Sequence, residues 1–220
     1  LLSLSASDYA CLEFVMSELY AAHEQRNISV QLPSLRVEGV TPELVRQMER
    51  GRKGGFTLAP EAATDRLRAV INKGNSEAEL LASIEKIAEL GWRHVKLYFM
   101  IGLPTETDED RAAIVELCRK VRNVLRRYDR NASIAVSVST FVPKPQTPFQ
   151  WVPMLKEEQV RNILFGLKDE LQSLRIEFRW HEIECSMVEG VMARGDRRLA
   201  DVIEMAWRNG ARYDGWNEYM

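Results

Sequence analysis

Hydrophobic and polar positions alternate most clearly in the segment VKLYFMIGLPTET, residues 95–107. A strand directs successive side chains to opposite faces, so the stretch 95–101 would have one apolar face and one mixed face. The apolar face holds Val95, Leu97, Phe99 and Ile101, and the mixed face holds Lys96, Tyr98 and Met100. Gly102 and Pro104 follow as a turn, and either Thr105 or Thr107 would cap a helix after it. We therefore expect the apolar face to pack on helices and the mixed face to line a barrel interior.

Similar patterns predict further strands, each followed by a helical segment. The expected strands cover residues 1–5, 28–32, 56–59, 95–101, 133–141 and 176–184. Thr64 is expected to cap a helix that ends at Ile71, and Ser76 with Glu79 has the spacing of a capping box. A last helix is expected over residues 199–208. Because strand and helix repeat about six times, the order predicts a parallel sheet with right-handed crossovers, open or barrel-shaped.

Polar residues collect at the predicted strand ends, which share one mouth in a parallel barrel. They are Ser5, Ser7, Asp8, Ser34, Arg36, Glu61, Lys96, Thr105, Lys144 and Thr147. Ordinary caps and solvated surface residues explain most of them. Glu61 is less ordinary because it follows an apolar strand and a proline. Lys96 is unusual because a lysine inside a strand lies either at a sheet edge or beside a partner.

Composition narrows the classes of function. The chain is 45% hydrophobic with a net charge of −2, so a large core can form and there is no general electrostatic reason to bind nucleic acid or a membrane. No apolar run approaches the length of a transmembrane helix. Cys11, Cys118 and Cys185 are too far apart for a metal-ligand motif, and three cysteines do not suggest a disulfide framework. A reducing cytoplasm fits best.

Four stretches of the chain resemble the radical S-adenosylmethionine (SAM) superfamily. FTLAPEAATDRLRAVINKG is similar to the fourth-strand segment, FMIGLPTET to the fifth-strand glycine motif, FVPKPQTPFQW to the sixth-strand loop, and LSLSASDY to the second strand. The core is similar to that of the methylthiotransferases. The tail EGVMARGDRRLADVIEMAWRNGARYDGW resembles an uncharacterised bacterial branch whose full chains also carry a cobalamin-binding-like region.

The resemblance implies an α/β fold, a partial (β/α)6 TIM-like barrel of the radical SAM type with a C-terminal α/β extension. It places the incomplete core at residues 1–151, the last helix and strand of the barrel region at 152–184, and an extension of unknown role at 185–220. In the family these segments meet the methionine amino group, the ribose and the adenine of SAM. The expected cofactor-binding residues are Ser5, Ser7, Glu61, Lys96, Tyr98, Gly102 and Thr147.

The chain departs from the family in one respect. The family binds a [4Fe-4S] cluster through three cysteines spaced CxxxCxxC, and this motif is absent here. The opening LLSLSASDY lacks a methionine and is typical of entry into a buried strand, so we expect that a segment with the cluster ligands precedes Leu1 and that the barrel is open beside residues 1–5. The implied cofactors are SAM, a cluster held by residues not in this chain, and cobalamin if the full protein uses it.

The implied reaction is reductive cleavage of SAM to a 5′-deoxyadenosyl radical, with a reductant such as flavodoxin or ferredoxin. The substrate is left open between RNA and a small molecule. One alternative is a non-catalytic barrel that binds RNA or a protein through its aromatic and basic tail. Another is a barrel lyase without a cluster that uses Lys96 as a Schiff-base amine, although the sequence pairs Lys96 with no acid.

Overall fold

A computed structural model of the chain describes residues 9–23, 26, 30, 41–49 and 55–211. The helices are α1 (Leu12–His23), α2 (Pro42–Glu49), α3 (Asp65–Val70), α4 (Glu77–Glu89), α5 (Asp108–Tyr128), α6 (Glu157–Ser173), α7 (Ile183–Arg194) and α8 (Leu199–Arg208). The strands are β1 (Phe56–Glu61), β2 (His94–Ile101), β3 (Ser133–Thr140) and β4 (Glu177–Trp180). The expected strands at 1–5 and 28–32, with the open edge expected beside the first, lie outside the described residues except for Val30.

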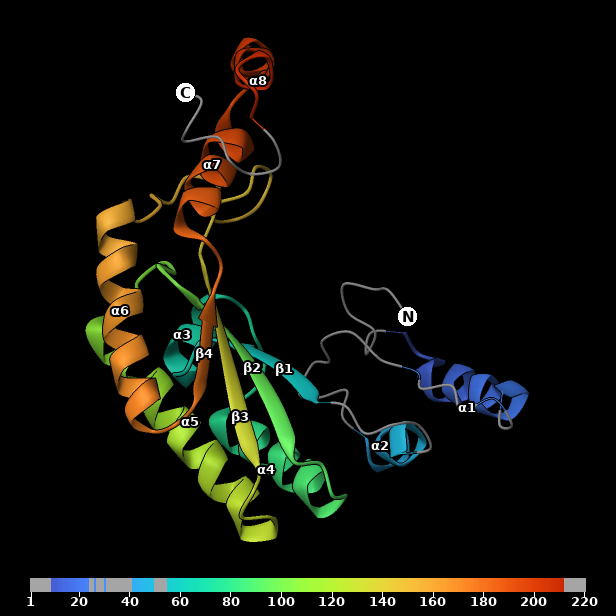
Figure 1. Cartoon of the computed structure of the whole chain (residues 1–220). Coiled ribbons are helices and arrows are strands. Elements are labelled where there is room, and N and C mark those ends of the chain that lie inside the picture. The colour runs from blue at the N-terminus through green and yellow to red at the C-terminus, as the bar shows by residue number, and fades with distance from the viewer. Residues whose placement is uncertain (1–8, 24–25, 27–29, 31–40, 50–54, 212–220) are drawn as a thin grey trace.

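The four strands form one sheet in the order β1-β2-β3-β4, and every neighbouring pair is parallel. Helices connect the strands, and α4, α5 and α6 lie along one face of the sheet (Figure 1). The predicted α/β class with a parallel sheet is therefore confirmed, and the arrangement is that of part of a (β/α) barrel.

The two faces of β2 differ as the alternation predicts. All four residues of the apolar face are at most 2% exposed and belong to the main core. Lys96, Tyr98 and Met100, on the mixed face, are only partly buried. β3 repeats this pattern of buried and partly buried residues. The helices thus take up one side of the sheet, and the described residues leave the other side partly exposed.

Capping residues set the helix starts that follow β1 and β2. Thr64 caps α3 by accepting a hydrogen bond from the backbone N–H of Leu67. Ser76 with Glu79 and Thr107 with Asp110 form complete capping boxes on α4 and α5. Thr107, and not Thr105, is therefore the cap after the central strand. Each such cap typically contributes about 1 kcal/mol to helix stability.

The last strand is shorter than its sequence suggested. We expected a strand over 176–184, but β4 ends at Trp180 and α7 begins at Ile183. Ile183 is buried in the main core, so packing favours a helix where the local apolar pattern also fits a strand. The division of the chain at residues 151 and 184 stays a prediction.

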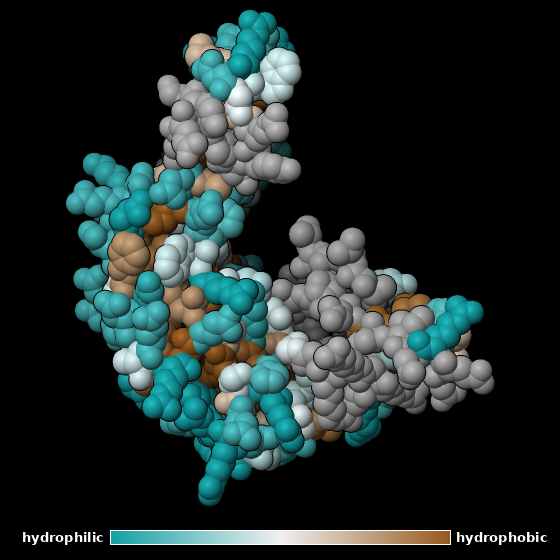
Figure 2. Space-filling view, in the orientation of Figure 1, coloured by the Kyte–Doolittle hydropathy of each residue, from teal (hydrophilic) through white to brown (hydrophobic). Residues whose placement is uncertain are grey.

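Two helices stand beyond the carboxyl ends of the strands. Figure 1 shows α7 leading away from the sheet, with α8 at its far end. The expected helix over 199–208 is confirmed as α8. It exposes Val202, Ile203, Met205 and Trp207. The surface of the α/β body is mainly hydrophilic with hydrophobic patches (Figure 2). Among the described residues, no helix has the length and apolar character needed to cross a membrane.

Candidate functional site

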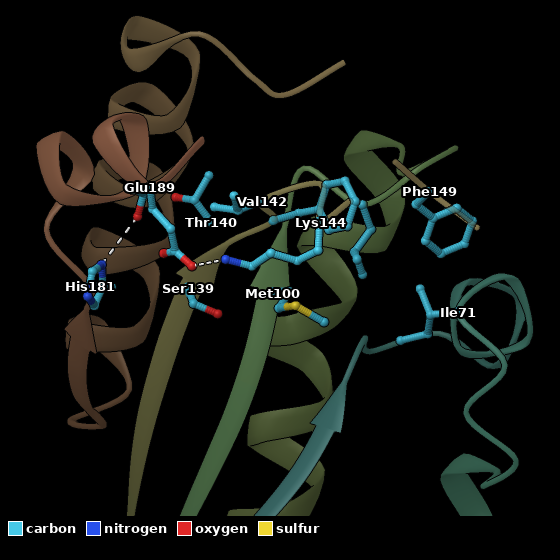
Figure 3. A pocket seen from close by; sticks show the side chains of 12 residues that line it. Ile71, Met100, Ser139, Thr140, Val142, Lys144, Phe149, His181 and Glu189 are labelled. Atoms are coloured by element: carbon cyan, nitrogen blue, oxygen red, sulfur yellow. Dashed lines mark hydrogen bonds and ion pairs between the residues drawn. The ribbon is translucent and has the colours of Figure 1, made fainter. Parts of the chain in front are cut away.

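A cavity of about 500 Å³ lies at the carboxyl ends of β2 and β3 (Figure 3). Ligands of α/β proteins bind at this end of the sheet, where loops distant in sequence converge. Its lining residues are Ile71, Met100, Leu103, Ser139, Thr140, Phe141, Val142, Lys144, Phe149, His181, Ser186 and Glu189. Six of these twelve residues are apolar, and most of the lining surface is apolar, as is usual for a small-molecule site.

Four segments contribute walls to this cavity. Ile71 follows α3, Met100 is the penultimate residue of β2 and Leu103 follows the strand, and the loop 141–152 after β3 supplies a third wall. Phe141 and Phe149 of that loop meet edge to face, with ring centroids 6.2 Å apart. The fourth wall comes from α7 and the residues before it. An apolar, partly aromatic interior of this kind suits a flat ring system.

Polar groups gather on the side of α7. Lys144 reaches from the loop to the carboxylate of Glu189 and forms an ion pair with it (Figure 3). His181 Nδ1 lies 3.3 Å from Ser186 Oγ. The loop after β3 and helix α7 are therefore joined across the cavity.

Asp110 ties together the loops that follow β1 and β2. Its carboxylate, only 3% exposed, accepts hydrogen bonds from the hydroxyl of Thr64 and from the backbone N–H of Thr107, the latter at 2.9 Å, and it pairs with Arg66. Arg66 also donates to the carbonyl of Thr105 at 2.9 Å. Burial alone would raise the pKa of Asp110, but these hydrogen bonds outweigh it and lower the pKa below its usual value. The two loops thus hold a fixed relative position.

Glu61 lies at the carboxyl end of β1, where the register with β2 shifts. Its backbone is left-handed, with φ of 65°, which is uncommon for a residue other than glycine. Its carboxylate is 26% exposed and lies 3.5 Å from Lys73 Nζ. Burial raises the pKa of Glu61, and the opposing effect of Lys73 is smaller. The residue is thus a half-buried carboxylate at the carboxyl ends of the strands, the end of the sheet at which the cavity lies.

Gly102 has a structural reason to be glycine. Its φ is 80°, and a Cβ there would lie 2.9 Å from Leu155 Cδ1. Its backbone N–H donates to Glu106 Oε2 at 2.8 Å, which shapes the turn after β2. Burial raises the pKa of Glu106, although bonds from Gly102 and Arg111 oppose the rise. A packing contact with Leu155 explains this glycine without a ligand.

Lys96 and Tyr98 contact each other on the mixed face of β2. Lys96 Nζ donates to the Tyr98 hydroxyl at 2.8 Å and lies 4.5 Å from the ring centroid. We expected both residues at the mouth of the barrel, and for Lys96 this placement was wrong. It is the third residue of the eight-residue strand β2, and a rise of about 3.3 Å per residue puts it roughly 16 Å from the carboxyl end.

The remaining expected site residues divide into two groups. Thr147 lies in the loop after β3, where its hydroxyl donates to the carbonyl of Lys144 at 2.7 Å and so braces the loop that lines the cavity. Ser5 and Ser7 lie outside the described residues. The cavity residues of α7, Ser186 and Glu189, were missed by the sequence analysis, and no motif in that segment signals them.

The cysteines do not fit an iron–sulfur cluster. Cys11 precedes α1, Cys118 lies in the middle of α5 and Cys185 lies in α7. Cys118 is fully buried in the core. Within the described residues, no group of three histidines, cysteines or carboxylates is placed to hold a metal ion. Since the described residues include every cysteine of the chain, its thiols cannot jointly ligate a cluster.

Burial gives the three thiols different reactivities. It raises the pKa of Cys118 to about 12, so this thiol is almost entirely protonated at pH 8. We expect Ellman's reagent to titrate Cys11 and Cys185 in the native chain and to reach Cys118 only in denaturant. Rapid reaction of all three thiols in the native chain would contradict the described packing of α5. A Cys118→Ala variant supplies the control, because its native and denatured titrations should give the same count.

Comparison with known proteins defines the class. The model of the radical SAM superfamily matches residues 5–118. This range covers more than half of the chain, and the chain belongs to that superfamily. The matched range contains β1, β2 and the helices between them. The match therefore includes Glu61 and Gly102 at the carboxyl ends of these strands.

Two relatives are similar over longer ranges. An uncharacterized protein of Methanocaldococcus jannaschii is 29% identical over 206 residues, which make up 93% of this chain and 43% of that protein. The tRNA-2-methylthio-N(6)-dimethylallyladenosine synthase of Pelotomaculum thermopropionicum is 26% identical over 141 residues, 64% of this chain and 30% of that enzyme. The matched region thus spans less than half the length of either relative.

Proposed function

We propose that the cavity binds the adenosyl group of SAM and that the chain is the SAM-positioning part of a radical SAM enzyme. One observation carries the proposal. The segments that resemble the family's fourth-strand segment, fifth-strand glycine motif and sixth-strand loop each contribute to one cavity, through Ile71, through Met100 and Leu103, and through the loop 141–152. These segments are far apart in sequence, and their convergence supports a common ligand.

Residues that line the cavity, and Glu61 outside its lining, would contact different parts of the ligand. Apolar side chains from β2 and from the loop 141–152 would enclose the adenine. Glu61, at the end of β1, would accept hydrogen bonds from the ribose hydroxyls, and such bonds to a carboxylate are stronger than neutral ones. Asp110 and Arg66 would act indirectly, because they hold the loops after β1 and β2 in place.

For the whole protein we propose the chemistry of the superfamily, reductive cleavage of SAM to a 5′-deoxyadenosyl radical. A [4Fe-4S] cluster would supply the electron, and its ligands would have to come from outside this chain because the chain's own cysteines do not fit. The proposed reductant is flavodoxin or ferredoxin, and the proposed location is the cytoplasm. One relative is named for a tRNA modification, which supports RNA among the candidate substrates. The use of cobalamin stays a prediction from sequence.

Binding of S-adenosylhomocysteine tests the adenosyl site without a cluster. We expect the chain to bind this ligand in isothermal titration, and we expect Glu61→Ala to weaken binding by roughly 10- to 100-fold, as for lost hydrogen bonds to a charged group. Glu116→Ala is the matched control, because Glu116 is an exposed carboxylate on α5 that pairs only locally, with Arg119. Equal affinities of the wild type and Glu61→Ala would remove Glu61 from the site.

The same titration has an expected pH dependence. Burial raises the pKa of Glu61, so the carboxylate that accepts ribose hydrogen bonds is lost at a higher pH than for an ordinary glutamate. Affinity should therefore fall on acidification, and the fall should be absent in Glu61→Ala.

The raised pKa of Glu61 changes the stability of the fold in the opposite direction, because protonation of Glu61 stabilises the folded chain. A raised native pKa favours the folded state below the unfolded pKa, and this benefit is lost as pH rises. Glu61→Gln should thus leave the chain at least as stable at pH 7.

A further inference from the structure

A second cavity, of about 380 Å³, also involves the loop 141–152. It is lined by Pro145, Gln150, Trp151, Ala193, Arg194 and Gly195. The same two segments, the loop and α7, therefore wall both cavities, with different residues facing each. The second cavity is large enough for a single nucleotide-sized group.

The backbone on both sides of Trp151 is fastened. Arg194 donates to the carbonyl of Gln150 at 3.2 Å and also to the carbonyl of Val152. The N–H of Val152 donates to the carbonyl of Phe149 at 3.0 Å, which closes a turn. The indole ring between these anchors is 87% exposed. A large aromatic ring on a fixed backbone is prepared to bind a flat partner, because little conformational freedom remains to be lost.

Further basic residues follow Arg194 closely in the sequence. The segment Arg194-Gly195-Asp196-Arg197-Arg198 carries three arginines and one aspartate. Asp196 pairs with Arg198. The neighbouring carboxylates of α7 are engaged elsewhere, Glu189 with Lys144 and Glu184 with Arg161. The local charge is therefore positive, although the chain as a whole is slightly acidic.

We propose that this second cavity binds one nucleotide of a single-stranded nucleic acid. The base would stack on Trp151, and a phosphate beside it would meet Arg197. Base stacking on an aromatic side chain with nearby basic residues is how proteins bind single strands without reading their sequence. A protein segment would be expected to need a broader apolar surface than a single exposed indole beside arginines.

The proposal names the substrate class of the radical SAM core, and in that respect it rests on the function proposed above. The loop 141–152 would lie between the adenosyl group and the bound strand, which would bring a neighbouring nucleotide near the first cavity. Binding at the second cavity can be measured alone. Loss of S-adenosylhomocysteine binding with retained nucleic-acid binding would refute only the first proposal, and the reverse result would refute only the second.

Fluorescence anisotropy with a labelled uridylate decamer tests the second cavity. A uracil-only strand is chosen because it lacks the adenine that the first cavity is proposed to bind. At about 50 mM salt, we expect saturable binding by the chain. Trp151→Ala should weaken it by roughly 5- to 150-fold, as for one lost stacking contact. Arg197→Gln should lower the slope of log affinity against log salt by about 0.7, as for one lost phosphate contact on a single strand. A deoxyuridylate decamer distinguishes DNA from RNA, and binding of either strand supports the proposal.

Two variants serve as controls. Tyr128→Ala removes an exposed aromatic ring at the far end of α5, and Trp207→Ala removes one from α8. Both should bind the decamers as the wild type does. Absence of binding to both decamers would overturn the proposal, and so would equal binding by Trp151→Ala and the wild type. It would also be overturned if Trp207→Ala alone lost binding, or if free uridylate bound as tightly as the decamer.

Discussion

Arg68→Ala is expected to lower the free energy of unfolding by about 3–5 kcal/mol, the largest effect of any single substitution considered. Arg68 is a charged residue with only 1% of its surface exposed. Its Nε donates to the carbonyl of Asn75 at 2.9 Å, its Nη1 donates to the carbonyl of Ala62 at 2.7 Å, and its Nη2 pairs with Asp65. Truncation would leave buried carbonyls without donors and would open a cavity.

Urea denaturation followed by circular dichroism would measure this loss. Arg119→Ala is the matched control, because Arg119 forms an exposed pair with Glu116 within α5 and should contribute less than about 1 kcal/mol. For a chain of this size, the melting temperature of Arg68→Ala should fall by roughly 2–4 °C per kcal/mol. A loss no larger than that of the control would show that the hydrogen bonds of Arg68 are not needed to hold α3 against β1.

Asp110→Asn is expected to cost about 2–3 kcal/mol, as for hydrogen bonds lost from a buried charged group. Asparagine has nearly the same shape but carries no charge. Its amide NH2 group would replace one carboxylate oxygen and would face groups that themselves donate hydrogen bonds. It would weaken the pairing with Arg66 and the bonds from Thr64 and Thr107. Since these bonds join the loops after β1 and β2, the affinity for S-adenosylhomocysteine should also fall, although Asp110 does not line the cavity.

The pH dependence gives Asp110→Asn a second readout. The native pKa of Asp110 is lowered, so its contribution to stability is present above the ordinary carboxyl value of 3.8 and is lost as pH falls through the native value. The difference in stability between the wild type and Asp110→Asn should therefore shrink on acidification. A difference that stays constant from pH 7 down to pH 3 would contradict the assigned ionised state. Glu116→Gln, at an exposed position on the same helix, is the control.

Much of the fold was accessible from sequence because it depends on local periodicity. The alternation in β2 correctly separated Val95, Leu97 and Phe99 from Lys96 and Tyr98. The capping box at Ser76 was also readable, because a cap depends on residues three positions apart, whereas for α5 the sequence left the choice between Thr105 and Thr107 open. These are short-range features, and tertiary packing did not override them.

Features that depend on distant residues were not accessible. Nothing in the sequence of α3 distinguishes buried Arg68 from exposed Arg66, because burial is set by Ala62 and Asn75 on neighbouring loops. The contact of Leu155 with Gly102 is of the same kind. The position of Lys96, in contrast, could have been predicted from the sequence, because the number of residues between Lys96 and the end of the strand gives its distance from the mouth of the barrel. For the cavity, the sequence indicated the segments around Gly102 and Thr147 but not α7.

The all-parallel sheet also has a consequence for how the chain reaches its native state. Each strand pairs with a neighbour separated by a whole helical crossover, and His94 and Ser133 in adjacent strands are 39 positions apart. None of these strand pairs can form as a hairpin. The entropy of closing a long loop is therefore lost before the first hydrogen bond between two strands can offset it. Slow folding of this kind keeps apolar strands such as β2 exposed for longer during synthesis. Production of the chain should therefore benefit from slow expression at low temperature, where association of unpaired strands competes less with folding.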